Sequence, residues 1–199
     1  MNTEYKTSIP TNPVNDFSNN FFKSLMLIVF LMISSAGYTQ VVHSYKNSVP
    51  QHRLSYFETH EELVISIMKS HKIPASITFA QAVIESNCGT SPLAKISNNQ
   101  FGIKRKSGDT KFVEHPERLG EYYRAYETVE ESIIDHANFL ANRIFYKPLF
   151  NLDIMDYKAW AHGLLECGYA TDPEYPNKLI RIIETHNLQL YDLEYAANY

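Results

Sequence analysis

Apolar residues recur at helical spacing along most of this chain, and a single stretch, residues 98–126, breaks the pattern. Ahead of that stretch, Leu63 and Ile67 share one face of a predicted helix over residues 61–71. Pro74 is expected to stop this helix, because proline has no backbone N–H with which to continue it. The pattern predicts a body of packed amphipathic helices with one interruption.

The second predicted helix is unusually apolar. Its apolar stripe consists of Phe79, Ala80, Val83 and Ile84. Either Ser76 or Thr78 is expected to cap its N-terminus, because a side-chain hydroxyl can accept a hydrogen bond from a free backbone N–H there. Gly89 is expected to end the helix, since glycine adopts a left-handed conformation at little cost.

The interrupting stretch is aromatic, β-branched and divided by turn residues. Its short segments are residues 101–104, 111–113 and 121–126. Such segments predict a small, irregular antiparallel sheet. Helical patterns then resume at residues 128–131, which have the form of a capping box. Further helices are predicted over residues 157–166 and 177–188, so the predicted fold class is α+β, mostly helical, with one small β-lobe.

The first forty residues differ from the rest of the chain. Lys23 precedes an apolar run over residues 25–33 and small residues over 34–37, an order typical of a signal peptide. This run is too short to span a bilayer as a helix, and an uncleaved N-terminal anchor is the alternative. We therefore expect an exported protein. The predicted parts are a polar leader with a signal peptide or anchor over 1–40, a linker over 41–55, a folded domain over 56–190 and a tail over 191–199.

Charge and cysteine content exclude several kinds of partner. A net charge of -4 and a pI of about 6.1 give the chain no basic field for nucleic acid. Cys88 and Cys167 are its only cysteines, and no Cys-x-x-Cys or His-x-x-x-His spacing accompanies them. We therefore expect no metal site and no other cofactor, and we expect a monomer.

Glu85 is the residue with the most informative surroundings. It lies near the C-terminal end of the apolar second helix, next to Val83 and Ile84. Burial among apolar neighbours and the negative end of the helix dipole both raise the pKa of a carboxyl group. A carboxylic acid that stays protonated near neutral pH can protonate a glycosidic oxygen. A solvent-facing glutamate without a task is the alternative.

Glu85 also belongs to the first of several ordered motifs. These motifs are residues 77–94 continued by Asn-Asn-Gln-Phe-Gly-Ile-Lys at 98–104, then 123–126 with 132–136, and finally Gly-Tyr-Ala-Thr-Asp-Pro-Glu-Tyr at 168–175. In their order and separation they resemble family 73 of the glycoside hydrolases. That family contains endo-β-N-acetylglucosaminidases, among them autolysins and the flagellar-rod peptidoglycan hydrolase. The resemblance covers roughly residues 56–188.

The resemblance implies a lysozyme-like helical lobe that faces the small β-lobe, with a sugar chain bound in the cleft between them. It implies that Glu85 is the catalytic acid and that Tyr169 lies beside the reacting sugar. A core tyrosine with a satisfied hydroxyl is the alternative for Tyr169. Asn99, Phe101 and Tyr175 are expected to bind substrate, although Phe101 could instead anchor the β-lobe to the helical lobe.

The resemblance also implies a second glutamate on the β-lobe. Glu114, Glu117 and Glu121 lie in the corresponding stretch. Glu121, 36 residues after Glu85 and at a strand start, is favoured as the second catalytic carboxylate, with Glu114 in reserve. A solvated hairpin glutamate is the alternative for each. The separation of the carboxylates would decide between a covalent and a water-mediated route, and attack by the 2-acetamido group of the substrate is a third route.

The resemblance implies, finally, that the motifs containing Cys88 and Cys167 lie together, so a disulfide between these residues is expected. The predicted activity is hydrolysis of the β-1,4 bond after N-acetylglucosamine in peptidoglycan, with glycan strands as the partner and no cofactor. The alternatives are a lytic transglycosylase or muramidase on a similar scaffold, and a catalytically silent glycan-binding protein.

Overall fold

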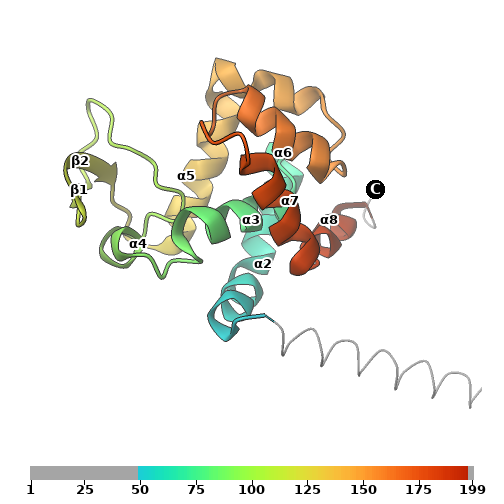
Figure 1. Cartoon of the computed structure of the whole chain (residues 1–199), viewed down its shortest axis with the longest axis horizontal. Helices are drawn as coiled ribbons and strands as arrows, with labels where there is room; N and C mark the ends of the chain where they lie inside the picture. Colours follow the sequence, from blue (N-terminus) through green and yellow to red (C-terminus); the bar gives the residue numbers. More distant parts are fainter. Residues whose placement is uncertain (1–48, 197–199) are drawn as a thin grey trace, which may run out of the picture. The chain divides into compact units, whose positions relative to one another are not determined.

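The structure is a computed structural model that describes residues 49–196. Its elements in chain order are α2 (Gln51–His71), α3 (Ala75–Ser86), α4 (Pro92–Ser97), β1 (Phe112–His115), β2 (Arg118–Arg124), α5 (Val129–Asn142), η1 (Ile144–Asn151), α6 (Tyr157–Glu166), α7 (Tyr175–Thr185) and α8 (Gln189–Ala196). Figure 1 shows β1 and β2 set to one side, and α2, α3, α6, α7 and α8 gathered together. The predicted α+β fold class, mostly helical with a small β-lobe, is confirmed.

The helical body is built around α3. Every α3 residue from Ala75 to Val83 is buried, and the helix contacts α2, α6, α7 and α8. A helix with apolar residues on all sides is stable only when other elements enclose it, and these four helices do so. The largest fully buried side chains of this core include Phe57, Met68, Phe79, Trp160, Leu164 and Leu179.

The N-terminus of α3 is capped from a distant part of the chain. α3 begins after Pro74, and neither Ser76 nor Thr78 provides a side-chain cap, so the predicted cap is wrong. Instead, Asp192 of α8 accepts a hydrogen bond from the backbone N–H of Ser76 at 2.9 Å. A side-chain oxygen at this position satisfies a free backbone donor at the start of the helix.

The β-lobe is a single antiparallel hairpin. β1 pairs with β2 so that Val113 lies opposite Tyr123, and the register shifts between Glu114 and His115. Lys104 forms an isolated bridge with Tyr123. The first of the three predicted β segments therefore contributes one bridge, and the other two form the hairpin.

Two later helices follow the sequence closely. Thr128 Oγ1 accepts a hydrogen bond from the Glu131 N–H at 3.2 Å, and Glu131 Oε2 accepts one from the Glu127 N–H at 2.9 Å. The predicted capping function of this segment is confirmed, and it starts α5. α6 spans the predicted residues 157–166.

The described helices extend past the predicted limits of the folded domain at both ends. α2 begins at Gln51, so residues 51–55, predicted as linker, are helical. α8 continues to Ala196, past the predicted end of the domain at residue 190. The predicted leader and the apolar run over 25–33 lie outside the described residues. Within residues 49–196, no helix has the length and apolar character needed to cross a membrane.

The expected disulfide is absent, because Cys88 and Cys167 are both free thiols. Cys88 is buried beyond the end of α3, where it interacts with Arg53 and Tyr56 of α2. Cys167 instead interacts with Tyr146 of η1. The two thiols face different elements, which corrects the prediction. Burial raises the pKa of Cys88 to about 12, so this side chain is a protonated, unreactive thiol at neutral pH.

The distal cap makes stability depend on pH. Burial raises the pKa of Asp192 from 3.8 to about 6. The folded state therefore favours the neutral Asp192 carboxyl group. The stability that this preference gives is fully present below about pH 4 and is lost as pH rises through about 6. Asp192→Asn keeps the oxygen that accepts from Ser76 but removes the charge, so at pH 7 it should raise the free energy of unfolding by up to about 3 kcal/mol.

Urea unfolding of both proteins at pH 4 and pH 7 measures this effect, and the gain should nearly vanish at pH 4. Asp192→Ala, which removes the acceptor, should destabilise the fold at both pH values. A variant Asp192→Asn that is less stable than the natural protein at pH 7 would contradict the prediction.

Candidate active site

A cleft of about 730 Å³ brings together four of the residues that the sequence singles out. They are Glu85, Phe101, Tyr169 and Tyr175. The loop after α4 and the start of β2 supply one part of the lining, and α3, α5, η1 and the segment leading into α7 supply the other. Asn99 and Glu121 are outside this lining.

Glu85 lies one residue before the end of α3, and its side chain is partly buried. Gln81 Nε2 donates a hydrogen bond to the Tyr175 hydroxyl oxygen at 3.2 Å, and the Tyr175 hydroxyl donates to Glu85 Oε1 at 3.0 Å. Because the Tyr175 oxygen accepts from Gln81, its own proton is directed at Glu85. The chain Gln81–Tyr175–Glu85 therefore orients one carboxyl oxygen.

The environment of Glu85 keeps its carboxyl group protonated to a higher pH than usual. Burial raises the pKa of Glu85, and the hydrogen bond from Tyr175 partly offsets this rise because it stabilises the charged form. The direction agrees with the expectation from the apolar sequence of α3. A partly buried carboxylic acid at a cleft is suited to proton donation.

A left-handed turn fixes the position of the α3 C-terminus. Asn87, Cys88 and Gly89 have φ values of 49°, 56° and 76°. α3 ends at Ser86, not at the predicted Gly89. Arg53 of α2 donates two hydrogen bonds to Asn87 Oδ1, at 3.0 and 2.7 Å. Left-handed conformations are unfavourable for non-glycine residues. The hydrogen bonds from Arg53 therefore hold this turn in place, and the turn anchors the end of α3.

An aromatic cluster surrounds Tyr169. Its ring centroid lies 5.8 Å from that of Tyr175, and its hydroxyl oxygen lies 3.3 Å from His136 Nε2. Phe101 stacks on His136 with centroids 3.9 Å apart and ring planes 11° from parallel. Burial lowers the pKa of His136 to about 3, so its imidazole is neutral. Both Tyr169 and Phe101 line the cleft. Phe101 also connects the loop after α4 to α5, and Tyr169 connects α5 to α7.

The side chain of Asn99 is bonded to backbone groups of the protein. Its side chain is buried; Nδ2 donates to the carbonyl oxygens of Ile103 and Arg124 at 3.0 and 2.9 Å, and Oδ1 accepts from the Ile103 N–H at 3.0 Å. These bonds join the loop after α4 to β2. Asn99 therefore shapes the cleft indirectly, by holding the segment that contains Phe101.

The β-lobe glutamates are engaged elsewhere. Glu121 Oε2 accepts a hydrogen bond from the Tyr123 hydroxyl at 2.7 Å and pairs with Lys104 Nζ at 3.0 Å. These two partners lower the pKa of Glu121, so it is a charged carboxylate. Glu114 Oε1 accepts from the Gly120 N–H at 2.6 Å within the hairpin. The structure thus brings neither carboxylate into the cleft that Glu85 lines.

Sequence reasoning missed the supporting residues Gln81 and His136. Gln81 lies four residues before Glu85, the spacing that places two side chains on one face of a helix. That spacing was a signal that could have identified Gln81. His136 belongs to the motif at 132–136, but only the fold shows that it contacts Phe101 and Tyr169.

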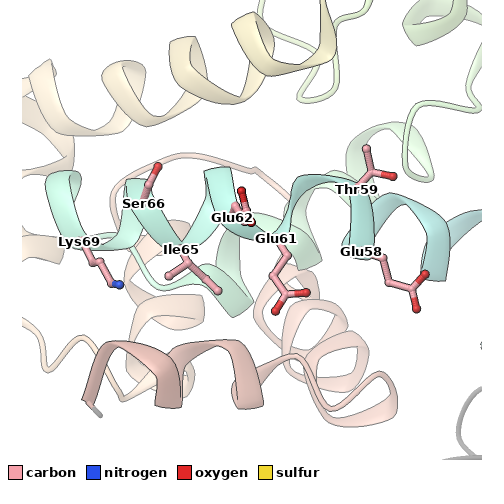
Figure 2. A pocket seen from close by; sticks show the side chains of 7 residues that line it. All are labelled: Glu58, Thr59, Glu61, Glu62, Ile65, Ser66 and Lys69. Carbon is pink, nitrogen blue, oxygen red and sulfur yellow. The ribbon is translucent and has the colours of Figure 1, made fainter. Parts of the chain in front are cut away.

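A second hollow, of about 610 Å³, lies along α2 and is drawn in Figure 2. Its lining consists of Glu58, Thr59, Glu61, Glu62, Ile65, Ser66 and Lys69, all from this one helix. It contains none of the predicted site residues. Within the described part of the chain, no group of three or more His, Cys, Asp or Glu residues is placed to hold a metal ion.

The helical body, the small hairpin and the cleft define a domain of the lysozyme-like class. A family model described as mannosyl-glycoprotein endo-beta-N-acetylglucosaminidase matches residues 61–188. The chain belongs to this family, the glucosaminidases of glycoside hydrolase family 73.

Relatives agree with this assignment. The chain is 32% identical to the exo-glucosaminidase LytG of Bacillus subtilis over 86% of this chain and 64% of that protein. It is 36% identical to an N-acetylmuramoyl-L-alanine amidase domain-containing protein of Staphylococcus aureus over 64% of this chain and 23% of that protein. The chain thus spans less than two thirds of the length of either relative. The crystal structure of a peptidoglycan hydrolase from Sphingomonas sp. A1 matches with a TM-score of 0.59 and 30% identity, over 69% of this chain and 91% of that one.

The hydrogen bond from Tyr175 has a measurable electrostatic effect. Tyr175→Phe removes a bond that stabilises the Glu85 carboxylate, so the pKa of Glu85 should rise further. The titration of the Glu85 carboxyl carbon by ¹³C NMR measures this shift directly. Tyr157→Phe is the matched control, because the Tyr157 hydroxyl bonds the remote Glu184 at 3.2 Å. A Glu85 pKa that falls or stays constant in Tyr175→Phe would refute the assigned hydrogen bond.

Proposed function

We propose that this chain is an endo-β-N-acetylglucosaminidase that hydrolyses the β-1,4 bond after N-acetylglucosamine in peptidoglycan, with Glu85 as the general acid. The observation that carries the proposal is the state of Glu85. Its carboxyl has a raised pKa, is held by Tyr175 and lines a cleft of about 730 Å³. The names of the relatives support the substrate, since LytG is an exo-glucosaminidase and the Sphingomonas protein a peptidoglycan hydrolase.

In the proposed reaction, protonated Glu85 donates its proton to the glycosidic oxygen as the bond to the anomeric carbon breaks. Glu85 Oε1 accepts from Tyr175, and Oε2 has no hydrogen bond recorded among the described residues, so Oε2 is the oxygen suited to deliver the proton. The same Tyr175 bond then stabilises the carboxylate that remains. Burial raises the pKa of Glu85, and the hydrogen bond limits the rise. This combination suits an acid that must give up its proton and later recover it.

The lining of the cleft bears on the nucleophile. Apart from Glu85, Asp172 is the one carboxylate among its described lining residues, and it bonds Lys178 and the backbone N–H of Glu174. This arrangement favours attack by the substrate's 2-acetamido oxygen on the anomeric carbon, followed by water. Tyr169 would then orient the reacting sugar. Glu121 could serve as the second catalytic carboxylate only after its ion pair with Lys104 opened.

The proposed substrate places the protein outside the cytoplasm, because that is where peptidoglycan lies. We propose that residues 25–33 direct export as a signal peptide or an anchor. The proposed reaction needs protons and water alone, so no metal or organic cofactor takes part, and a single copy of the domain carries the whole cleft.

Glu85→Gln should lower the rate of lysis of purified sacculi by about 10²–10⁴-fold, because an amide cannot supply the proton. Circular dichroism checks that the fold is intact. Glu166→Gln is the matched control, since Glu166 lies on α6 outside the cleft. Lysis by Glu85→Gln at the natural rate would exclude Glu85 as the acid.

Mass spectrometry of the released fragments identifies the bond. The natural protein should release internal fragments with reducing-end N-acetylglucosamine. Anhydro or reducing-end muramic products would instead indicate a lytic transglycosylase or muramidase. Release of single terminal sugars would indicate exo-cleavage, as in the name of LytG. Sacculus binding without any fragment would indicate a silent glycan-binding protein.

The role of Glu121 can be separated from that of Glu85. The lysis rate of Glu121→Gln should stay at least about ten times that of Glu85→Gln. The reason is that Glu121 bonds Tyr123 and Lys104 and is outside the cleft lining. Glu114→Gln serves as the comparison within the same hairpin. If Glu121→Gln loses as much lysis as Glu85→Gln, a protein carboxylate from the β-lobe takes part in the reaction.

A further inference from the structure

The cleft that contains Glu85 is cationic, although the chain as a whole is not. The whole sequence has a net charge of -4, but the cleft lining includes five basic side chains against two carboxyl groups, Glu85 and Asp172. The basic residues are Lys104, Arg105, Lys106, Arg118 and Arg143. Positive charge gathered in a cleft of an acidic protein points to a ligand that carries negative charge.

Four of these basic residues, Arg105, Lys106, Arg118 and Arg143, are exposed and form no ion pair within the described part of the chain. Lys104 pairs with Glu121 at 3.0 Å. For Arg105 and Arg143, no ion pair with a carboxylate is recorded in residues 49–193, and both side chains lie exposed. They also come from different elements, since Arg105 belongs to the loop after α4 and Arg143 ends α5.

Both guanidinium groups lie over aromatic rings. The Arg105 Cζ atom lies 3.7 Å from the ring centroid of Phe112, and the Arg143 Cζ atom lies 3.7 Å from that of Phe139. Stacking uses the face of a guanidinium and leaves the N–H groups at its edge free to donate. A planar, oriented donor set of this kind matches the two oxygens of a carboxylate.

We propose that Arg105 and Arg143 bind carboxylates on the substituents of the glycan, so that the cleft selects acid-bearing peptidoglycan strands over neutral N-acetylglucosamine polymers. This inference rests on the proposed function, because it concerns the same cleft. In peptidoglycan, the muramic residues carry a lactyl group that ends in a peptide with free carboxylates, and removal of the peptide leaves the lactyl carboxylate itself. Chitin oligosaccharides share the β-1,4 linkage and the acetamido groups but carry no charge.

Binding measurements in the Glu85→Gln background test the proposal without turnover. Calorimetry would compare three probes: glycan strands with intact peptides, strands from which the peptides have been removed, and chitohexaose. Arg105→Gln/Arg143→Gln should weaken binding of an acid-bearing strand about tenfold and that of chitohexaose by at most about twofold. The loss for each of the two acidic probes shows whether peptide or lactyl carboxylates supply the contact.

Two further variants refine the comparison. Arg181→Gln is the control, because Arg181 is an exposed arginine of α7 outside the cleft lining. It should leave all three affinities unchanged. Arg105→Lys/Arg143→Lys keeps the charge but not the planar donor set, so it should restore only part of the loss. The preference of the parent for acidic strands should also decrease as salt is raised to 0.5 M.

Equal losses for charged and neutral probes would overturn the proposal, as would affinities that are unaffected by the double variant. Equal effects of Arg181→Gln would overturn it too, because they would show a general effect of charge. The outcome is distinguishable from failure of the proposed function. Selective binding of acidic strands without any lysis by the natural protein would reject the glycosidase proposal and keep the carboxylate site.

Discussion

The hydrogen bond between Tyr175 and Glu85 is the contact on which the rest of the candidate site depends. It joins the end of α3 to the start of α7, elements 90 residues apart in the chain. Gln81 sets its direction by occupying the Tyr175 oxygen. The packing of α7 on α3 therefore has an electrostatic consequence, since it opposes the effect of burial on the pKa of Glu85. Folding and proton affinity are coupled through one hydroxyl group.

The Tyr175–Glu85 hydrogen bond can act in this way only if α3 is held in place at both ends. At the C-terminal end, Arg53 from α2 donates hydrogen bonds to Asn87, the first of three left-handed residues. At the N-terminal end, Asp192 from α8 accepts from the backbone. Between these ends, the buried faces of α3 contact helices on several sides. A carboxyl group at the end of so constrained a helix needs little reorganisation when charge changes beside it, which is the structural requirement for electrostatic catalysis.

The sequence predicts what depends on local pattern. Periodicity identified α2, α3, α5, α6, α7 and the hairpin, but not α4, η1 or α8. Residues 128–131 identified the start of α5, because hydrophobic spacing and capping act within a few residues. The cap on α3 was missed because its partner, Asp192, lies 116 residues from Ser76. The position of Glu121 could not be predicted for the same kind of reason. Motif spacing places it on the β-lobe, but its contacts with Lys104 and Tyr123 depend on the fold of the hairpin and of the loop after α4.

The cleft has a neutral part around Glu85 and a charged part around Arg105 and Arg143. Around Glu85, the buried rings of Tyr175 and Phe101 and the neutral His136 add no full charge. A cation placed there would lower the pKa of Glu85 and so oppose protonation. The guanidinium groups of Arg105 and Arg143 lie instead over the exposed ring of Phe112 and the half-buried ring of Phe139. Solvent screens their field there. Under the proposed function, this separation would let one cleft attract an acidic polymer while the pKa of Glu85 stays raised.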